Sequence, residues 1–129
     1  MKYAVLIARI LLGLVFLISG VNHIVPFLPM KPMSGDAGTF SMILLTSKYL
    51  SVVGVLDVIG AVLLLVGRYV PLALVLLGPI IVNILLFDVL LASAGLAIGV
   101  VIALLEVFLI FTYRANFAGI FQSGAEPAI

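Results

Sequence analysis

Four long apolar segments dominate this chain and leave it few ways to fold. They cover residues 3–26, 49–67, 71–91 and 95–113. Each is long enough to cross the roughly 30 Å hydrocarbon core of a bilayer as a helix. Hydrophobic residues make up 66% of the sequence and charged residues 9%, against about 45–50% and about 25% in soluble domains. A soluble domain of this length could not bury that much apolar surface, so we expect an integral membrane protein.

The expected fold is all-α: one membrane-embedded, up-down-up-down four-helix bundle over residues 1–115, with a structured loop between the first two spans. Residues 116–129 form a short C-terminal tail. We expect the first span to be retained, because its apolar run exceeds the 7–15 residues of a signal-peptide core and Arg9 interrupts it.

The connection between the first two spans is the longest in the chain. Three prolines break the helix before it: Pro26, Pro29 and Pro32. Residues 33–38 (MSGDAG) are typical of a turn, and Thr39 or Ser41 would start a short apolar helix through Leu45. Two interpretations stay open, a loop lying in the membrane interface or a lid over a cavity mouth.

The small and polar residues of the first span fall on one helical face. The stripe recurs at steps of three and four and also includes one large apolar residue: Arg9, Gly13, Phe16, Gly20 and His23. This spacing predicts that the stripe faces protein. Leu11, Leu14 and Val15 are better placed to face lipid.

Asp57 lies in the middle of the second span, within residues 53–68 (VGVLDVIGAVLLLVGR). A central Asp costs roughly 2.5 to 3.5 kcal/mol on insertion scales, so such residues usually face a bundle interior and mark a site or an ion pair. Gly54 and Gly60 stand at i−3 and i+3 on the same broad face and would let another helix come close.

Four spans place both chain ends on one side of the membrane. That side holds Lys2, Arg68 and Arg114, whereas the other holds Lys31 and Lys48. The positive-inside rule therefore predicts cytoplasmic termini, in a bacterial inner (cytoplasmic) membrane.

Counting about 1.5 Å of helix per residue puts Arg9, Asp57 and Glu106 in one inner layer. Under a structural interpretation, Arg9 pairs with Glu106 or with Asp57 and sets the helix register. Under a functional one, a single cation cannot neutralise two carboxylates. A carboxyl is then left to bind a proton, a cation or the polar head of a quinone-like amphiphile.

A second polar group lies nearer the outer end. Here His23 and Asp88 are expected to pair across the first and third spans, with Asn22 adding hydrogen bonds. This group is either an interfacial polar cap or an entry point for protons or ligand. Asn83 is expected to satisfy carbonyls freed by Pro79 rather than to bind a ligand.

Several functions are excluded by what the sequence lacks. There is no cysteine, which rules out a disulfide framework and thiol chemistry. His23 is the only histidine, so the chain has no metal site of its own. The net charge of +1 indicates no nucleic-acid partner. No self-contained catalytic motif is present, and the catalytic residues stay unassigned.

The sequence resembles the DoxX-like family of small four-helix membrane proteins over residues 8–114. The resemblance is carried by ARILLGLVFLISGVNHIVPFLP in the first span and VGVLDVIGAVLLLVGRYVPLALVLLGPIIVNILLF in the next two. It implies a polar core at Arg9, Asp57 and Asn83. The family pattern more often has Glu at the position of Asp57 and His at that of Asp88. A role tied to that histidine is therefore in question here.

The resemblance implies a membrane accessory or anchor subunit of a redox system, such as quinone-linked oxidation of sulfur compounds, with a partner carrying the flavin, iron or thiol chemistry. The site would be Arg9, Asp57, Asn83 and Glu106, and its ligand a quinone or a lipid. Partners would be the bilayer and other membrane subunits or further copies of the chain. The alternatives are a non-enzymatic scaffold or chaperone, as in distant animal relatives, and a proton-coupled carrier of small molecules.

Overall fold

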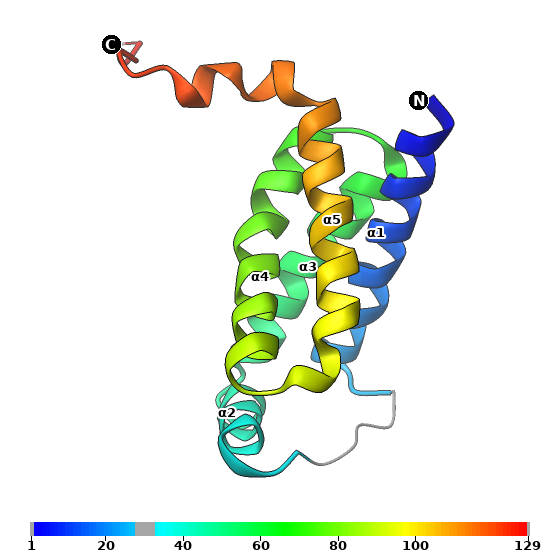
Figure 1. Cartoon of the computed structure of the whole chain (residues 1–129), viewed down its shortest axis with the longest axis vertical. Helices are drawn as coiled ribbons and strands as arrows, with labels where there is room; N and C mark the ends of the chain where they lie inside the picture. The colour runs from blue at the N-terminus through cyan, green and yellow to red at the C-terminus, as the bar shows by residue number, and fades with distance from the viewer. Residues whose placement is uncertain (1, 28–32, 129) are drawn as a thin grey trace.

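The structure is a computed structural model that describes residues 2–27 and 33–128, so Pro29, Lys31 and Pro32 lie outside the described residues. Four long helices form a bundle (Figure 1): α1 Lys2–Ile24, α3 Tyr49–Val66, α4 Val70–Leu90 and α5 Leu96–Thr112. The shorter elements are α2 Gly35–Thr46 and two 3₁₀ segments, η1 Ser93–Gly95 and η2 Arg114–Phe121. The described ranges contain no strand, and the all-α class expected from the sequence is confirmed.

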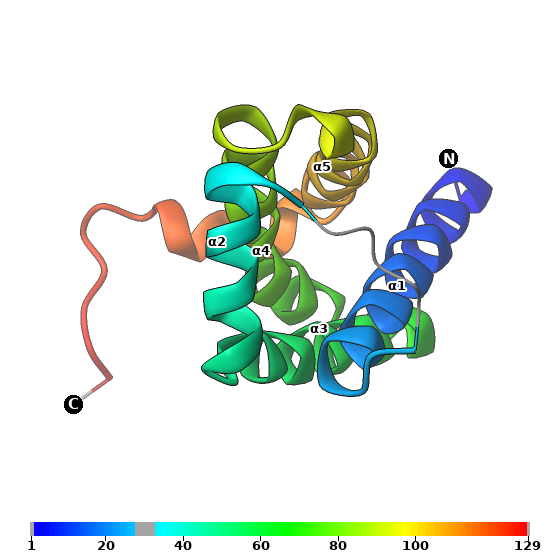
Figure 2. The same ribbon diagram turned by 90° about the horizontal axis from the view of Figure 1, so that it is seen from below.

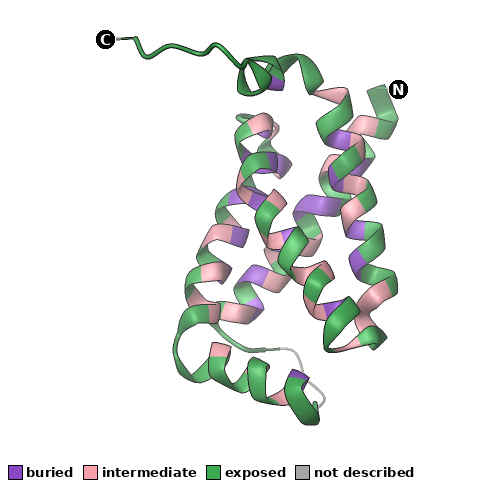
Figure 3. Ribbon diagram, turned by 60° about the vertical axis from the view of Figure 1, so that its left-hand side comes forward, coloured by how far each residue is buried: buried purple, intermediate pink, exposed green. Residues whose placement is uncertain are grey.

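The four long helices begin and end within two residues of the apolar segments in the sequence. By length and composition, each could cross a membrane. Large apolar side chains remain exposed on the outside of all four, including Leu11, Val62, Val75 and Leu104. Figure 3 shows the buried residues turned toward the middle of the bundle. Soluble monomers rarely expose apolar surface so widely, and lipid is the solvent that suits it.

Each long helix packs against its neighbours in a closed ring, α1 with α3, α3 with α4, α4 with α5 and α5 with α1. Figure 1 places both chain ends at one end of the bundle and α2 at the other. The interior is filled by large side chains, the most deeply buried being Leu12, Phe16, Leu64, Leu74, Leu77 and Leu109.

Helices α1 and α3 approach each other closely where Gly20 and Gly54 meet backbone to backbone. A Cβ built on Gly20 would lie 2.8 Å from the Gly54 carbonyl oxygen, and one on Gly54 would lie 2.7 Å from that of Gly20. The small-residue face of α1 therefore packs on protein as expected. Leu11 and Leu14 are exposed, whereas Val15 packs partly against the core and does not fully face lipid.

The helix in the long connection begins earlier than the sequence indicates. It starts at Gly35, so residues 35–38 are helical rather than a turn. Asp36 lies in the first turn, where a carboxylate favours the positive end of the helix dipole. The Thr39 hydroxyl donates to the Gly35 carbonyl. Figure 2 shows α2 lying across the end of the bundle. Its Phe40 ring contacts Phe87 of α4, with the centroids 5.7 Å apart.

The C-terminal tail begins with a helical segment. Residues 114–121 form η2, and Phe117 is 8% exposed and packs against the hydrophobic core. A buried aromatic ring contributes a large apolar area, which explains why the start of the tail packs against the bundle.

Candidate functional site

Asp57 and His23 meet between α3 and α1. The distance from His23 Nδ1 to Asp57 Oδ2 is 3.4 Å, an ion pair when the imidazole is protonated. Asp57 is only 1% exposed, whereas the His23 side chain is 26% exposed. The pair therefore joins a carboxyl group inside the apolar bundle to the end of the bundle that α2 covers.

The direction of side chains on antiparallel helices explains this contact. His23 lies three residues after Gly20 on α1, and Asp57 lies three residues after Gly54 on α3. Because the two helices run in opposite directions, the Cα atoms of His23 and Asp57 lie on opposite sides of the Gly20–Gly54 contact along the bundle axis. Helical side chains lean toward the N-terminus of their own helix. On antiparallel helices the two therefore lean toward each other. The matching spacings GVNH and GVLD are the sequence signal that could have predicted this pair.

Arg9 does not join this pair, and the expected ion pairs of Arg9 with Asp57 or Glu106 are wrong. Its Nε donates to the Leu64 carbonyl oxygen at 3.0 Å, and no carboxylate among the described residues pairs with it. The reason is the relative length of the helices, 23 residues in α1 against 18 in α3. The N-terminal part of α1 therefore lies level with the last turn of α3, beyond Asp57.

Glu106 on α5 is 4% exposed, and neither of its carboxyl oxygens has a hydrogen-bond partner among the described residues. Its Oε1 faces Gly78 of α4, 3.8 Å from where a Cβ on that glycine would stand. A buried polar group without a partner is costly. Glu106 is thus the least satisfied acid in the described bundle.

The outer polar group is not brought together as expected, because His23 pairs with Asp57 rather than Asp88. The Asp88 carboxylate packs instead on α5, where a Cβ on Gly99 would come within 2.5 Å of its Oδ2. The Asn22 side chain accepts a hydrogen bond from the Phe27 backbone N–H at 3.0 Å and ties down the chain after α1.

Asn83 lies apart from Arg9 and Asp57, on the exposed face of α4. Its side-chain amide donates to the Pro79 carbonyl oxygen one turn earlier, at 3.1 Å. A proline frees the carbonyl four residues before it, here that of Val75, so the bond to Pro79 is not the expected bond to a freed carbonyl. The expected polar core with Arg9 and Asp57 is not formed either, because Asn83 is exposed. The helix itself continues through Pro79.

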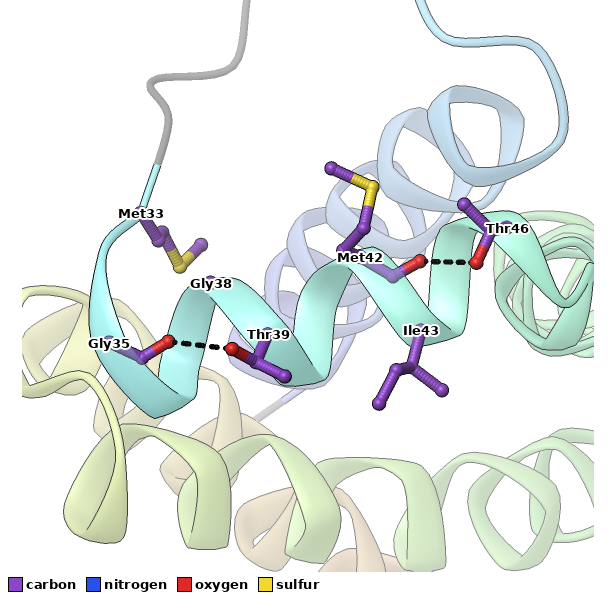
Figure 4. A pocket seen from close by; sticks show the side chains of 7 residues that line it. All are labelled: Met33, Gly35, Gly38, Thr39, Met42, Ile43 and Thr46. Carbon is purple, nitrogen blue, oxygen red and sulfur yellow. Dashed lines mark hydrogen bonds between the residues drawn. The ribbon is translucent and has the colours of Figure 1, made fainter.

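Two surface cavities have the size of a ligand site. The larger, about 450 Å³, lies on α2 with Met33 at its edge (Figure 4). Its two threonine hydroxyls, of Thr39 and Thr46, donate to carbonyls of α2 itself. None of the predicted site residues lines it. The other cavity, at the opposite end of the bundle, is lined in part by Arg9.

The fold and its buried acids define a small integral membrane protein of four apolar helices, with a carboxyl–imidazole pair and a separate unpartnered carboxyl inside the bundle. The sequence matches the family model DoxX over residues 4–89, and the chain belongs to the DoxX family. Comparison with curated proteins and with solved structures found no match. The matched segment includes His23 and Asp57 but ends before α5, which carries Glu106.

Proposed function

We propose that this DoxX-family chain is the membrane accessory subunit of a quinone-linked redox system and that it exchanges protons for a partner carrying the redox cofactor. The observation that supports the proposal is the His23–Asp57 pair, which connects a buried carboxyl to the end of an otherwise apolar bundle. Ionisable groups inside a membrane are expensive and usually mark proton or substrate pathways.

The two members of the pair suit proton transfer. An imidazole ring can take up a proton on one ring nitrogen while releasing one from the other. The partial exposure of His23 gives it access to the surface, and its contact with Asp57 carries that access into the bundle. Proton exchange between the surface and Asp57 would run through this contact.

Glu106 supplies the second part of the proposal, a ligand contact. A carboxyl with two unpartnered oxygens would be satisfied by a hydrogen-bonding group, such as the oxygen of a quinone or quinol head. Reduction of a quinone to a quinol takes up two electrons and two protons. In this scheme the partner subunit supplies the electrons, and the bundle supplies protons.

The orientation follows the positive charge. Lys2, Arg68 and Arg114 lie at the end that holds the two termini, which we place in the cytoplasm of a bacterium. His23 and α2 then face the opposite side, so that the pair would exchange protons with the outer compartment.

The test uses the full-length tagged chain in its native membranes, with Asp57→Asn, His23→Gln and the control Asp36→Asn. Asp36 is an exposed acid on α2 at the same end as His23. Asp36→Asn therefore makes the same chemical change as Asp57→Asn, but outside the bundle. Co-purified proteins and lipophiles are identified by mass spectrometry, and quinone reduction is followed in the membranes.

We expect a flavin- or iron-containing partner to co-purify with the wild type and with all three variants. Quinone reduction should fall at least tenfold in Asp57→Asn and His23→Gln and stay unchanged in Asp36→Asn. If Asp57→Asn keeps full turnover, the proton-exchange role is wrong. If no cofactor-bearing partner is found, the redox assignment is wrong.

A second candidate is a non-enzymatic scaffold that packs against a larger membrane complex. It is favoured by the filled interior, in which Leu12, Leu64 and Leu77 have no exposed surface. In that case the same purification would return a complex without redox cofactors, and Asp57→Asn would change only the stability of the chain.

A further inference from the structure

A cavity of about 380 Å³ lies between α1 and the end of α5, within the range of about 300–1,000 Å³ typical of ligand pockets. Its lining residues come from the first turns of α1 and from the residue after α5: Lys2, Tyr3, Val5, Leu6, Arg9 and Tyr113. The cavity lies at the end of the bundle where both termini are found (Figure 1). It is therefore separate from the His23–Asp57 pair.

The guanidinium of Arg9 is held in place by α3. Its Nε donates to the Leu64 carbonyl oxygen at 3.0 Å. Gly67 leaves room for the rest of the group, because a Cβ there would lie 2.7 Å from the Arg9 Nη2. The described residues accept one hydrogen bond from this side chain, and the donors on the two terminal nitrogens remain for a ligand.

The charge of the lining is positive only. Lys2 and Arg9 both line the cavity, and none of the acidic residues that the structure describes does. Tyr3 and Tyr113 add two hydroxyl groups that can donate hydrogen bonds. Val5 and Leu6 provide an apolar wall. Two cations, two hydroxyl donors and a hydrocarbon surface match a phosphate group that carries acyl chains.

We propose that this cavity binds the head group of an anionic phospholipid. Arg9 and Lys2 hold the phosphate, and the part of an acyl chain nearest the head group lies along Leu6. A membrane lipid fits better than free phosphate, because Leu6 and Tyr3 are exposed on the outside of α1 beside the cavity. The cavity is therefore bordered by surface that faces the hydrocarbon and head-group regions.

The test is native mass spectrometry of the full-length chain reconstituted in vesicles of equimolar phosphatidylglycerol and phosphatidylcholine and then extracted in mild detergent. We expect one phosphatidylglycerol to stay bound to the wild type in preference to phosphatidylcholine. The variant Lys2→Gln should lower its occupancy about fivefold, since each basic residue near a membrane surface contributes attraction of that order. Lys48→Gln, at the opposite end, is the matched control and should retain the lipid.

Arg9→Gln should lower the lipid occupancy further. Arg9→Lys should recover part of the occupancy, because a lysine keeps the positive charge but lacks the planar guanidinium that can donate two parallel hydrogen bonds to a phosphate. Arg9 also contacts α3, so Lys2→Gln decides the question if the Arg9 variants do not fold. Equal retention of the two lipids, or equal retention by Lys2→Gln and wild type, would overturn the proposal. Displacement of the lipid by excess inorganic phosphate would assign the cavity to the free anion instead.

Discussion

At the scale of single residues, glycine decides where the ionisable side chains of this bundle can lie. Each of four ionisable side chains lies against a glycine in, or directly after, a neighbouring helix: Asp57 against Gly20, Arg9 against Gly67, Glu106 against Gly78 and Asp88 against Gly99. A Cβ on Gly67 or Gly99 would come within 2.7 Å of an atom of the charged group, and one on Gly20 would lie 2.9 Å from the Asp57 Cβ. At Gly78 the distance to Glu106 is 3.8 Å, an ordinary contact. Small residues at helix contacts let backbones approach in membranes, and here they also hold the polar groups inside the bundle.

The buried, unpartnered carboxyl of Glu106 lowers the stability of the folded chain, and a substitution can remove this loss. We predict that Glu106→Met stabilises the chain by roughly 1–3 kcal/mol, because a buried group without a partner is replaced by an apolar side chain of similar size. The measurement is thermal unfolding in one detergent. Glu126→Met, an exposed acid in the tail, should leave the midpoint unchanged. A loss of stability in Glu106→Met would mean that the carboxyl has a partner in the folded chain.

The His23–Asp57 contact can be measured by a double-mutant cycle. We expect His23→Gln and Asp57→Asn each to destabilise the chain, and the double variant to lose less than the sum. The expected coupling is about 0.5–3 kcal/mol, as for residues in direct contact. The readout is the unfolding midpoint in detergent for the four proteins. Strict additivity would show that the two side chains do not interact.

At the scale of helices, the α1–α3 contact organises the bundle. Gly20 and Gly54 bring the two backbones together, and this crossing sets which residues of the two helices are level. From that register it follows that Arg9 reaches the last turn of α3 and that His23 reaches Asp57. The axial offset of one helix pair thus determines both polar contacts.

We predict that Gly20→Ala destabilises the chain by about 1–3 kcal/mol, as over-packing of a close contact does. The added Cβ would meet a backbone oxygen at 2.8 Å, and a backbone cannot move aside as a flexible side chain can. Unfolding in detergent measures the loss. The matched control is Gly119→Ala, where nothing lies within 4 Å. Equal stability of the two variants would show that α1 and α3 are further apart than described.

At the scale of the whole molecule, the bundle has two chemically different ends. One holds both termini, Arg68 and the cavity with Arg9, and the other holds α2, the exposed acid Asp36 and His23. Excess basic charge at the first end is what orients membrane proteins toward the cytoplasm. The proposed proton exchange and the proposed lipid site therefore belong to opposite membrane faces.

The absence of cysteine in the sequence makes this orientation directly measurable. We predict that Lys48→Cys, in the exposed turn before α3, reacts with a membrane-impermeant maleimide on intact cells. Gly124→Cys, in the exposed tail, should react only after the membrane is permeabilised. Labelling in the reverse pattern would place the termini outside and the lipid cavity in the outer leaflet.

Local sequence is enough to predict the four helices, their apolar surfaces and the face of α1 that packs on protein. These properties depend on local composition and on the helical repeat of 3.6 residues, which is the same in every α-helix and can be read without knowing the tertiary contacts. The DoxX resemblance was also readable from sequence, and the family match confirms it. The early start of α2 was not predicted, because Gly35 and Gly38 are typical of a turn and the helix there lies against the rest of the bundle.

Which polar groups meet depends on how the helices pack against one another. Depth counting placed Arg9 beside Asp57 because it assumed that the helices end level, whereas α1 has 23 residues and α3 has 18. An offset of one or two turns is enough to exchange one partner for another, since a side chain reaches only a few ångströms. Asp57 therefore pairs with His23, and Arg9 is left to bind the end of α3 and to line a cavity.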